Sequence, residues 1–172
     1  MIIHHVKEVI DKCVGSDEQF DDITMVCVQY NGSKMKNIVS YECEADIANL
    51  EAMLNPIMDK LRLIGVNQKL MYQINLALEE LFVNVAHYAY YPNKGIIHIQ
   101  YQIKDAPKRL IVTIKDEGTP FNPLESEEPD LNAPIQERKI GGLGLFIVKK
   151  TMDDIKYTRE NGSNILEITK QL

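Results

Sequence analysis

Residues 76–90 read LALEELFVNVAHYAY, and this stretch decides how the rest of the chain is interpreted. From Asn67 onward, apolar side chains recur at helical spacing, which predicts one helix over about 67–90. Glu80 and Asn84 lie one turn apart on the opposite, polar face. An amide oxygen can complete a magnesium shell beside phosphates, and a neighbouring carboxylate can accept a proton. Alone, this spacing is more typical of a solvated helix face.

The surrounding segments predict the order helix, helix, hairpin, loop, helix, hairpin. Alternating apolar residues predict the strands, whereas apolar residues three and four apart predict the helices. The expected elements are a strand over 37–43, a helix over 46–63, the helix over 67–90, strands over 97–103 and 110–114, a helix over 143–152, and strands over 155–159 and 165–170. We therefore predict an α+β fold, a two-layer sandwich in which helices cover one face of a mixed, mainly antiparallel sheet.

Two further polar blocks follow the long helix. The first, DEGTP at 116–120, begins where a strand ends. There, Asp116 can accept a hydrogen bond from the amino group of adenine, and Gly118 allows a base to approach the backbone. The second, GGLGL at 141–145, opens an apolar helix whose first N–H groups can face phosphate. Taken singly, the first block is typical of an ordinary turn, and the second fits a flexible glycine junction as well as it fits a phosphate site.

The order of the three blocks is more specific than any one of them. LALEELFVNVAHYAY, DEGTPFNP and GGLGLFIVKKTMDDIKY resemble the successive ATP-binding motifs of the GHKL ATPases, most closely of the anti-sigma-factor serine kinase branch. The resemblance extends from about residue 44 to the C-terminus. It implies a Bergerat-type ATP-binding fold and a cytoplasmic enzyme that uses ATP and Mg²⁺ to phosphorylate a serine or threonine of another protein.

The resemblance also implies a role for each matched position. Glu80 corresponds to the general base, Asn84 to the asparagine that coordinates magnesium, and Asp116 to the aspartate that reads adenine. Gly118 supports the same pocket. The nucleotide contacts of the third motif fall on consecutive residues, Gly142, Leu143 and Gly144.

Residues 121–140 correspond to the ATP lid of the family. They contain several prolines and acids without periodicity, as expected of a long functional loop. Within this loop, Arg138 or Lys139 could meet the phosphates, although a solvated cation is the simpler interpretation. The final hairpin departs from the family pattern, because Ser163-Asn164 stands where threonines usually face the nucleotide.

The first 32 residues form a separate region in this interpretation, and the ATPase domain is assigned to 33–172. QFDDITMVCVQY at 19–30 resembles the closing segment of type 2C, spore-phosphatase-like serine/threonine phosphatases, in which the position of Asp22 is a metal ligand. The other carboxylates of a dinuclear site are missing, so we predict no phosphatase activity. The expected explanation is a fragment of a phosphatase–kinase fusion or a late start site, and an unrelated N-terminal arm is the alternative.

Composition narrows the class of protein further. The 172 residues are 45% hydrophobic and 26% charged, as in a globular domain, and the net charge of −6 disfavours nucleic acid. No apolar run reaches the roughly 20 residues that cross a bilayer, and residues 1–12 have neither the apolar core nor the small-residue cleavage site expected of a signal peptide. Three widely spaced cysteines without a C-x-x-C pair indicate reduced thiols in the cytoplasm.

The partners follow from the resemblance alone. It implies an antagonist protein of the anti-anti-sigma type as substrate, a sigma factor as a second partner, and a homodimer. A non-catalytic, ATP-gated module that sequesters a partner is the alternative, and an intact Glu80 favours the enzyme. A sensor histidine kinase is less consistent with the sequence, because His4 and His5 lie at the extreme N-terminus without a long helix around them.

Overall fold

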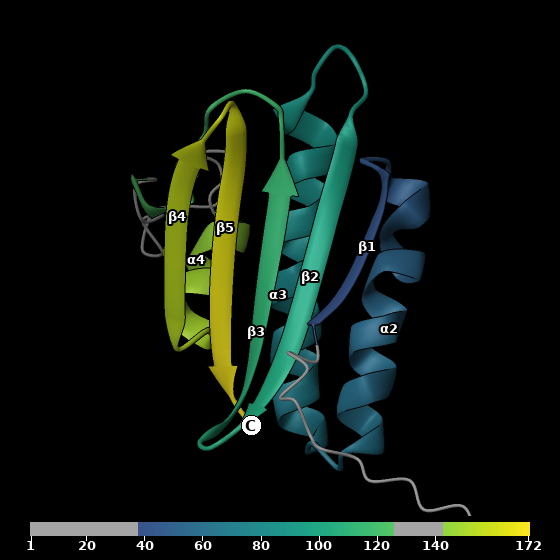
Figure 1. Ribbon diagram of the computed structural model, residues 1–172, viewed down its shortest axis with the longest axis vertical. Helices are drawn as coiled ribbons and strands as arrows, with labels where there is room; N and C mark the ends of the chain where they lie inside the picture. The colour runs from purple at the N-terminus through teal and green to yellow at the C-terminus, as the bar shows by residue number, and fades with distance from the viewer. Residues whose placement is uncertain (1–37, 126–142) are drawn as a thin grey trace, which may run out of the picture. The chain divides into compact units, whose positions relative to one another are not determined.

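The computed structural model of the chain describes residues 38–125 and 143–172, which Figure 1 shows in colour. The predictions for residues 1–32, including Asp22, lie outside the described residues. The same holds for Gly142 and for the two cations of the lid, Arg138 and Lys139.

Five strands form one sheet, with the spatial order β1-β2-β3-β5-β4. They are β1 (Ile38–Glu44), β2 (Ile96–Asp105), β3 (Lys108–Asp116), β4 (Asp154–Glu160) and β5 (Ser163–Gln171). Each of the four pairings is antiparallel. The α+β prediction is confirmed, and the sheet is antiparallel at every described pairing rather than mixed.

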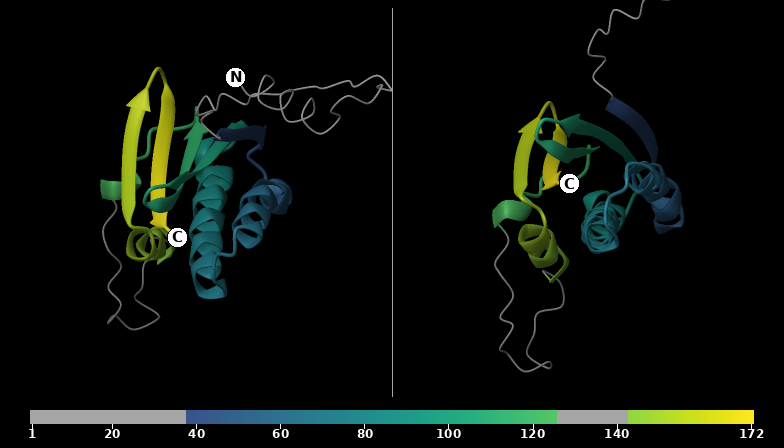
Figure 2. Two further views of the ribbon diagram at one scale, coloured as in Figure 1. Left: turned by 60° about the horizontal axis from the view of Figure 1, so that its bottom comes forward. Right: turned by 90° about the horizontal axis from the view of Figure 1, so that it is seen from below.

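Three helices cover one face of this sheet, as Figure 2 shows. They are α2 (Leu50–Leu63), α3 (Gln68–Asn84) and α4 (Leu143–Thr151). The side chain of Asn67 caps α3 by accepting a hydrogen bond from Leu70 N at 3.0 Å. Asp46 caps a short 3₁₀ turn, Ile47–Asn49, that leads directly into α2. None of the described helices combines the length and the apolar character needed to cross a bilayer.

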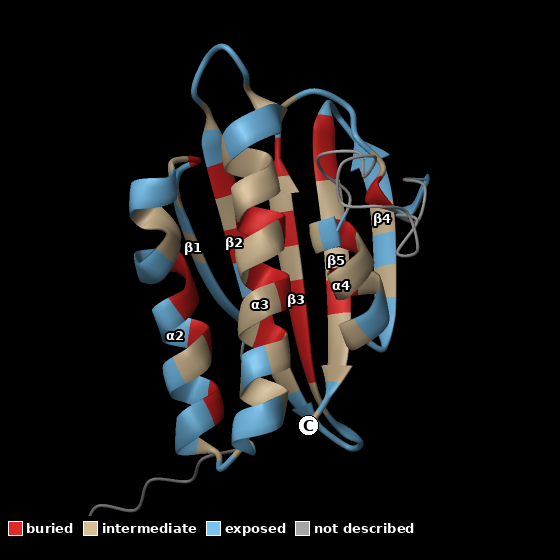
Figure 3. Ribbon diagram, turned by 180° about the vertical axis from the view of Figure 1, so that it is seen from behind, coloured by how far each residue is buried: buried red, intermediate tan, exposed pale blue. Residues whose placement is uncertain are grey.

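The core lies between the helices and the inward face of the sheet. Alternate residues of the strands point into this layer, and they meet the apolar stripes of α2 and α3. The largest fully buried side chains come from both layers: Phe82, Ile57, Leu61, Ile74, Leu78, Ile97, Ile99, Leu110, Ile168, Val112 and Val148. Figure 3 shows in red the buried stretches of the helices and of the strands that they cover. The helical and alternating patterns read from the sequence therefore define the core correctly.

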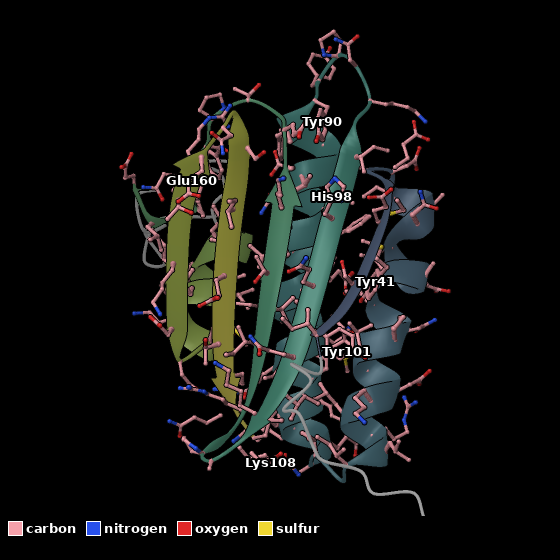
Figure 4. The ribbon with its side chains drawn as sticks, viewed as in Figure 1. Tyr41, Tyr90, His98, Tyr101, Lys108 and Glu160 are labelled. Carbon is pink, nitrogen blue, oxygen red and sulfur yellow. The ribbon has the colours of Figure 1, made fainter. Side chains whose placement is uncertain are left out.

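Two tyrosines of the sheet fasten α2 near its internal proline (Figure 4). Tyr41 donates from its hydroxyl to Met53 O at 2.7 Å, and Tyr101 donates to Pro56 O at 3.3 Å. Both acceptors are backbone carbonyls of the turn around Pro56, so the two hydroxyls tie the sheet to this part of α2. Burial, with the neighbouring Tyr101 as a further cause, raises the pKa of Tyr41 well above its ordinary value.

The end of α3 departs from the uniform helix that the sequence predicts. After Asn84 the backbone widens into a π-helical turn, Val85–Ala89. Such turns are rare and frequently occur at functional sites. The 3.6-residue period therefore ends at Asn84. Within the π-helical turn, His87 lies exposed with its ring edge-on to Tyr88.

The last hairpin has a two-residue turn. Asn161 and Gly162 take φ values of 50° and 82°, which suits the primed turns that match strand twist. This turn fixes the register of β4 and β5, in which Asn164 lies opposite Arg159. On its other side, Asn164 lies opposite Asp116 at the end of β3. The hairpin thus places Asn164 beside the predicted adenine-reading residue.

Candidate functional site

The first and third predicted motifs meet where α3 passes α4. A Cβ atom on Gly144, in the first turn of α4, would overlap the carboxylate of Glu80. Glu80 therefore lies directly against the glycine backbone at the beginning of a helix, where the dipole favours negative charge. Residues 64 positions apart are brought together, and the absence of a side chain at Gly144 makes the approach possible.

Asn84 is the last residue of α3 and is half-buried. Within the described residues neither its side chain nor that of Glu80 forms a hydrogen bond. An unengaged amide oxygen is the type of hard ligand that Mg²⁺ accepts together with water and phosphate oxygens. No group of three or more His, Cys, Asp or Glu in the described ranges could itself hold a metal. The donor set thus fits a magnesium ion that arrives with a nucleotide.

Asp116 ends β3 and is only 6% exposed. Its Oδ1 accepts a hydrogen bond from Gly118 N at 2.9 Å and another from Asn164 Nδ2 at 2.8 Å. Both contacts fall on one oxygen, and no other described residue bonds to Oδ2. A buried carboxylate with one oxygen fixed and the other available suits recognition of an amino group.

Gly118 allows a close approach to its backbone, but the group that approaches it in this structure is another part of the protein and not a nucleotide base. A Cβ on Gly118 would collide with the backbone of Ala89, at the end of the π-helical turn. The adjacent Thr119 donates from its N–H to Ala89 O at 2.7 Å. The glycine therefore lets the second motif pack on the end of the helix that carries the first.

Tyr90 reinforces the same junction, and Figure 4 shows it between the end of α3 and the upper ends of β2 and β3. Its hydroxyl donates to Ile96 O at 2.6 Å and accepts from Glu117 N at 2.7 Å. Gly95 packs directly on its ring, because a Cβ there would overlap the ring atoms. Burial is the main cause that raises the pKa of Tyr90, so the hydroxyl stays protonated and can donate.

Leu143, predicted to contact nucleotide, begins α4 and is 54% exposed. The prediction for Gly142 falls outside the described residues. A short 3₁₀ turn, Pro123–Glu125, ends the described range that precedes residues 126–142. It packs beside α4, where Lys149 Nζ donates to Leu124 O at 3.2 Å. The described residues at the beginning of the predicted lid are thus fastened to the same helix that the glycine block opens.

Sequence reasoning missed the importance of Asn164, Tyr157 and Arg159. Asn164 is 6% exposed and bonds to Asp116, and the other two side chains donate to its Oδ1. A signal was present in the sequence, because Asn164 precedes Leu166 and Ile168 at inward positions of one strand. A polar residue in such a row indicates a buried hydrogen-bonded partner.

The structure also contains a hollow with a volume of about 360 Å³, which shares Tyr90 and Glu117 with the junction described above. It is lined by Glu42, Tyr90, Gly95, Ile96, His98 and Glu117. None of the predicted site residues lines it. Its Glu42 carboxylate pairs with His98 Nδ1 at 2.8 Å on the face of the sheet away from the helices. We therefore place the candidate site between α3, α4 and the ends of β3 and β5.

Comparison with known proteins gives the following matches. Residues 43–170 match the histidine kinase-like ATPase domain. The serine-protein kinase RsbW of Bacillus mycoides is 30% identical over 100 residues, which cover 56% of this chain and 61% of that protein. The protein of the same name from Listeria monocytogenes is 28% identical over 108 residues, 59% of this chain and 67% of its own length. The match to the Staphylococcus aureus protein is 29% over 94 residues, 52% of this chain and 59% of that one.

The chain thus matches between about three fifths and two thirds of the length of these curated relatives. A crystal structure of the RsbU and RsbW domains of a Mycobacterium tuberculosis protein is similar with a TM-score of 0.55. That match covers 78% of this chain and 32% of the other, at 14% sequence identity. At this identity, the likeness supports the fold alone.

Proposed function

Because the chain belongs to the histidine kinase-like ATPase family, we propose that it is an ATP-dependent serine/threonine protein kinase that acts as an anti-sigma-type regulator. The observation that carries this proposal is the contact between the Glu80 carboxylate and Gly144. It joins a candidate base to the helix terminus at which phosphates would lie.

In this proposal, ATP lies between α3 and α4 with its base toward β3. Asp116 accepts a hydrogen bond from the adenine amino group. The backbone N–H groups at the start of α4, at Leu143 and Gly144, face the phosphates together with Gly142. Asn84 supplies one oxygen ligand to Mg²⁺, which when bound neutralises charge on the transferred phosphoryl group.

The transfer step then requires one base. The acceptor hydroxyl loses its proton to the Glu80 carboxylate as its oxygen bonds to the γ-phosphorus. The bond from that phosphorus to the bridging oxygen of ADP breaks, and ADP leaves with the electron pair. Glu80 fits this role because it is half-buried beside Gly144 and forms no hydrogen bond with a described side chain.

The substrate class rests on the relatives, which are named serine-protein kinase RsbW. We propose that the acceptor is a serine or threonine of an antagonist protein of the anti-anti-sigma type. We propose further that a sigma factor is the second partner and that the chain acts as a homodimer.

The direct test uses the purified chain, ATP labelled in its γ-phosphate, Mg²⁺ and each anti-anti-sigma-like protein encoded in the same genome. The expected result is label on a serine or threonine of one of these proteins, and none without Mg²⁺. ATP binding without transfer to any candidate would instead support the non-catalytic module that sequesters a partner.

The resemblance of residues 19–30 to the end of a type 2C phosphatase is a separate proposal. Its support is the single motif that contains Asp22. The expected result is that the chain does not hydrolyse a serine phosphopeptide with Mn²⁺ or Mg²⁺, because one carboxylate cannot hold a dinuclear site. Metal-dependent hydrolysis would contradict this proposal.

A further inference from the structure

A buried polar network centred on Asn164 lies behind Asp116. Asn164 Nδ2 donates to Asp116 Oδ1 at 2.8 Å and to Thr119 O at 3.0 Å. Asn164 Oδ1 accepts from Tyr157 OH at 2.8 Å and from Arg159 Nη1 at 2.6 Å. The side chain is 6% exposed. Every polar atom of this amide therefore has a partner inside the protein.

The partners permit only one orientation of the amide. Asp116 and the Thr119 carbonyl present acceptors, so the amino group must face them. Arg159 is a donor without acceptor capacity, and it faces the amide oxygen. Reversing the amide would set oxygen against carboxylate and amino group against guanidinium, which would leave buried groups unsatisfied. Strand β4, through Tyr157 and Arg159, thus fixes which end of Asn164 meets Asp116.

The orientation of Asn164 determines what Asp116 can offer a ligand. The Asn164 amino group and Gly118 N both bond to Oδ1, at 2.8 and 2.9 Å, and hold the carboxylate plane. Oδ2 stays available among the described residues. With its plane held and Oδ2 available, the carboxylate presents an acceptor at this point. It suits a ligand that donates at this point and opposes one that presents an oxygen.

We propose that Asn164 is a positioning residue that holds Asp116 as an acceptor, and that it thereby makes the site select a 6-amino purine over a 6-oxo purine. Tyr157 and Arg159 act through it by locking the amide. This inference rests on the proposed ATP-binding function, and it adds the origin of base selectivity. Arg159 also donates to Gly118 O at 3.2 Å, so its side chain holds the loop that follows Asp116 as well as the Asn164 amide.

The test compares two variants of nearly identical shape, Asn164→Thr and Asn164→Val, by calorimetric titration with ATP and with inosine triphosphate. The threonine hydroxyl can still donate to Asp116 and accept from Arg159, whereas valine can do neither. We expect the wild-type protein to prefer ATP over inosine triphosphate by about tenfold or more. The Asn164→Thr variant should retain this preference. In the Asn164→Val variant, affinity for ATP should fall by about tenfold, whereas affinity for inosine triphosphate should change little.

The ratio of the two affinities separates this role from a merely structural one. General damage to the fold would weaken both nucleotides together and leave the ratio unchanged, which would overturn the proposal. Equal ATP affinity of the Thr and Val variants would also overturn it. Absence of ATP binding by wild type itself would instead overturn the proposed function, and the inference with it.

A third variant, Asn164→Asp, tests the electrostatics if Asn164→Val does not fold. Two neighbouring carboxylates disfavour full ionisation, and a shared proton restores the donor toward Asp116. Among the described residues, Arg159 and Tyr157 on β4 bond to position 164, and Glu117 follows Asp116 in the chain. We expect ATP affinity of this variant to rise about tenfold from pH 8 to pH 5.5, unlike that of Asn164→Thr. Parallel pH profiles of the two variants would contradict the proposed role.

Discussion

The two ends of the candidate site are held in different ways. At the base end, Asp116 is fixed by hydrogen bonds from Gly118 and Asn164, which are set by strand register and a two-residue turn. At the phosphate end, Glu80 touches Gly144 without a hydrogen bond to any described side chain. Preorganised donors and acceptors suit the recognition of a fixed ligand, whereas a base must reach a proton that arrives with the substrate. We therefore expect substitutions at the base end to reduce stability and binding, and those that remove or displace the Glu80 carboxylate at the phosphate end to reduce transfer alone.

The largest effect is expected for Glu80→Gln, which keeps the shape of the side chain and removes the base. Phosphotransfer should fall about 10²- to 10⁴-fold, whereas affinity for ATP should stay within about threefold of wild type. Single-turnover transfer of labelled phosphate measures the first quantity and calorimetry the second.

The neighbouring Glu79→Gln is the matched control, since Glu79 is half-buried on the same helix but is not the residue against Gly144. It should transfer at the wild-type rate. If both variants transferred at that rate, Glu80 would not be the base.

At the base end, Gly118→Ala should lower the free energy of unfolding by about 1–3 kcal/mol, because its Cβ would meet the backbone of Ala89. ATP binding should weaken in parallel. Urea denaturation measures the stability. Gly65→Ala is the control: its space is open and its φ is +77°, so it should cost about 1 kcal/mol from backbone strain without changing ATP affinity.

Gly144→Ala should reduce phosphotransfer without reducing stability, the reverse of what Gly118→Ala should do, and its effect should be smaller. Alanine is the better helix former by about 1 kcal/mol, so thermal stability should not fall. Its Cβ would displace the Glu80 carboxylate, and the transfer rate should drop about tenfold. A loss of stability comparable to that of Gly118→Ala, with transfer unaffected, would contradict the proposed difference between the two ends.

The smallest effect is expected for Asp153→Asn, far from both ends. Partial burial acts to raise the pKa of Asp153, but bonds from Gln171 N and the Lys170 ammonium lower it below its ordinary value. A lowered pKa stabilises the fold above the unfolded value of about 4, and this contribution is lost as the pH falls. The substitution should cost under about 1 kcal/mol at pH 7 and progressively less below pH 4, with ATP affinity unchanged.

Most of the fold could be predicted because its periodicities are local. The helical stripe that contains Ile74 and Leu78, the alternation around Ile99, and the cap at Asn67 each follow from short-range geometry. The π-helical turn could not be predicted, since nothing in the spacing of residues 85–89 distinguishes it from a continuing α-helix. It depends on the packing of Ala89 against Gly118 and Thr119, which come from a distant part of the chain.

The site could be predicted at the level of motifs but not of supporting contacts. Glu80, Asp116 and Gly144 were identified because their order along the chain resembles a family, and their roles remain predictions. The turn at Asn161-Gly162 is visible in the sequence and joins β4 to β5, but the network around Asn164 also depends on the register of β5 against β3, which no short-range pattern specifies. Long-range register is therefore what separated the recognised residues from the missed ones.

The most direct test of the account is a calorimetric titration of the purified chain with ATP, with and without Mg²⁺, alongside Asn84→Ala. We predict saturable binding that is strengthened by Mg²⁺ in wild type, with this strengthening lost in the variant. Absence of ATP binding in both conditions, or an equal response to Mg²⁺ in wild type and Asn84→Ala, would contradict the assignment of the site between α3 and α4.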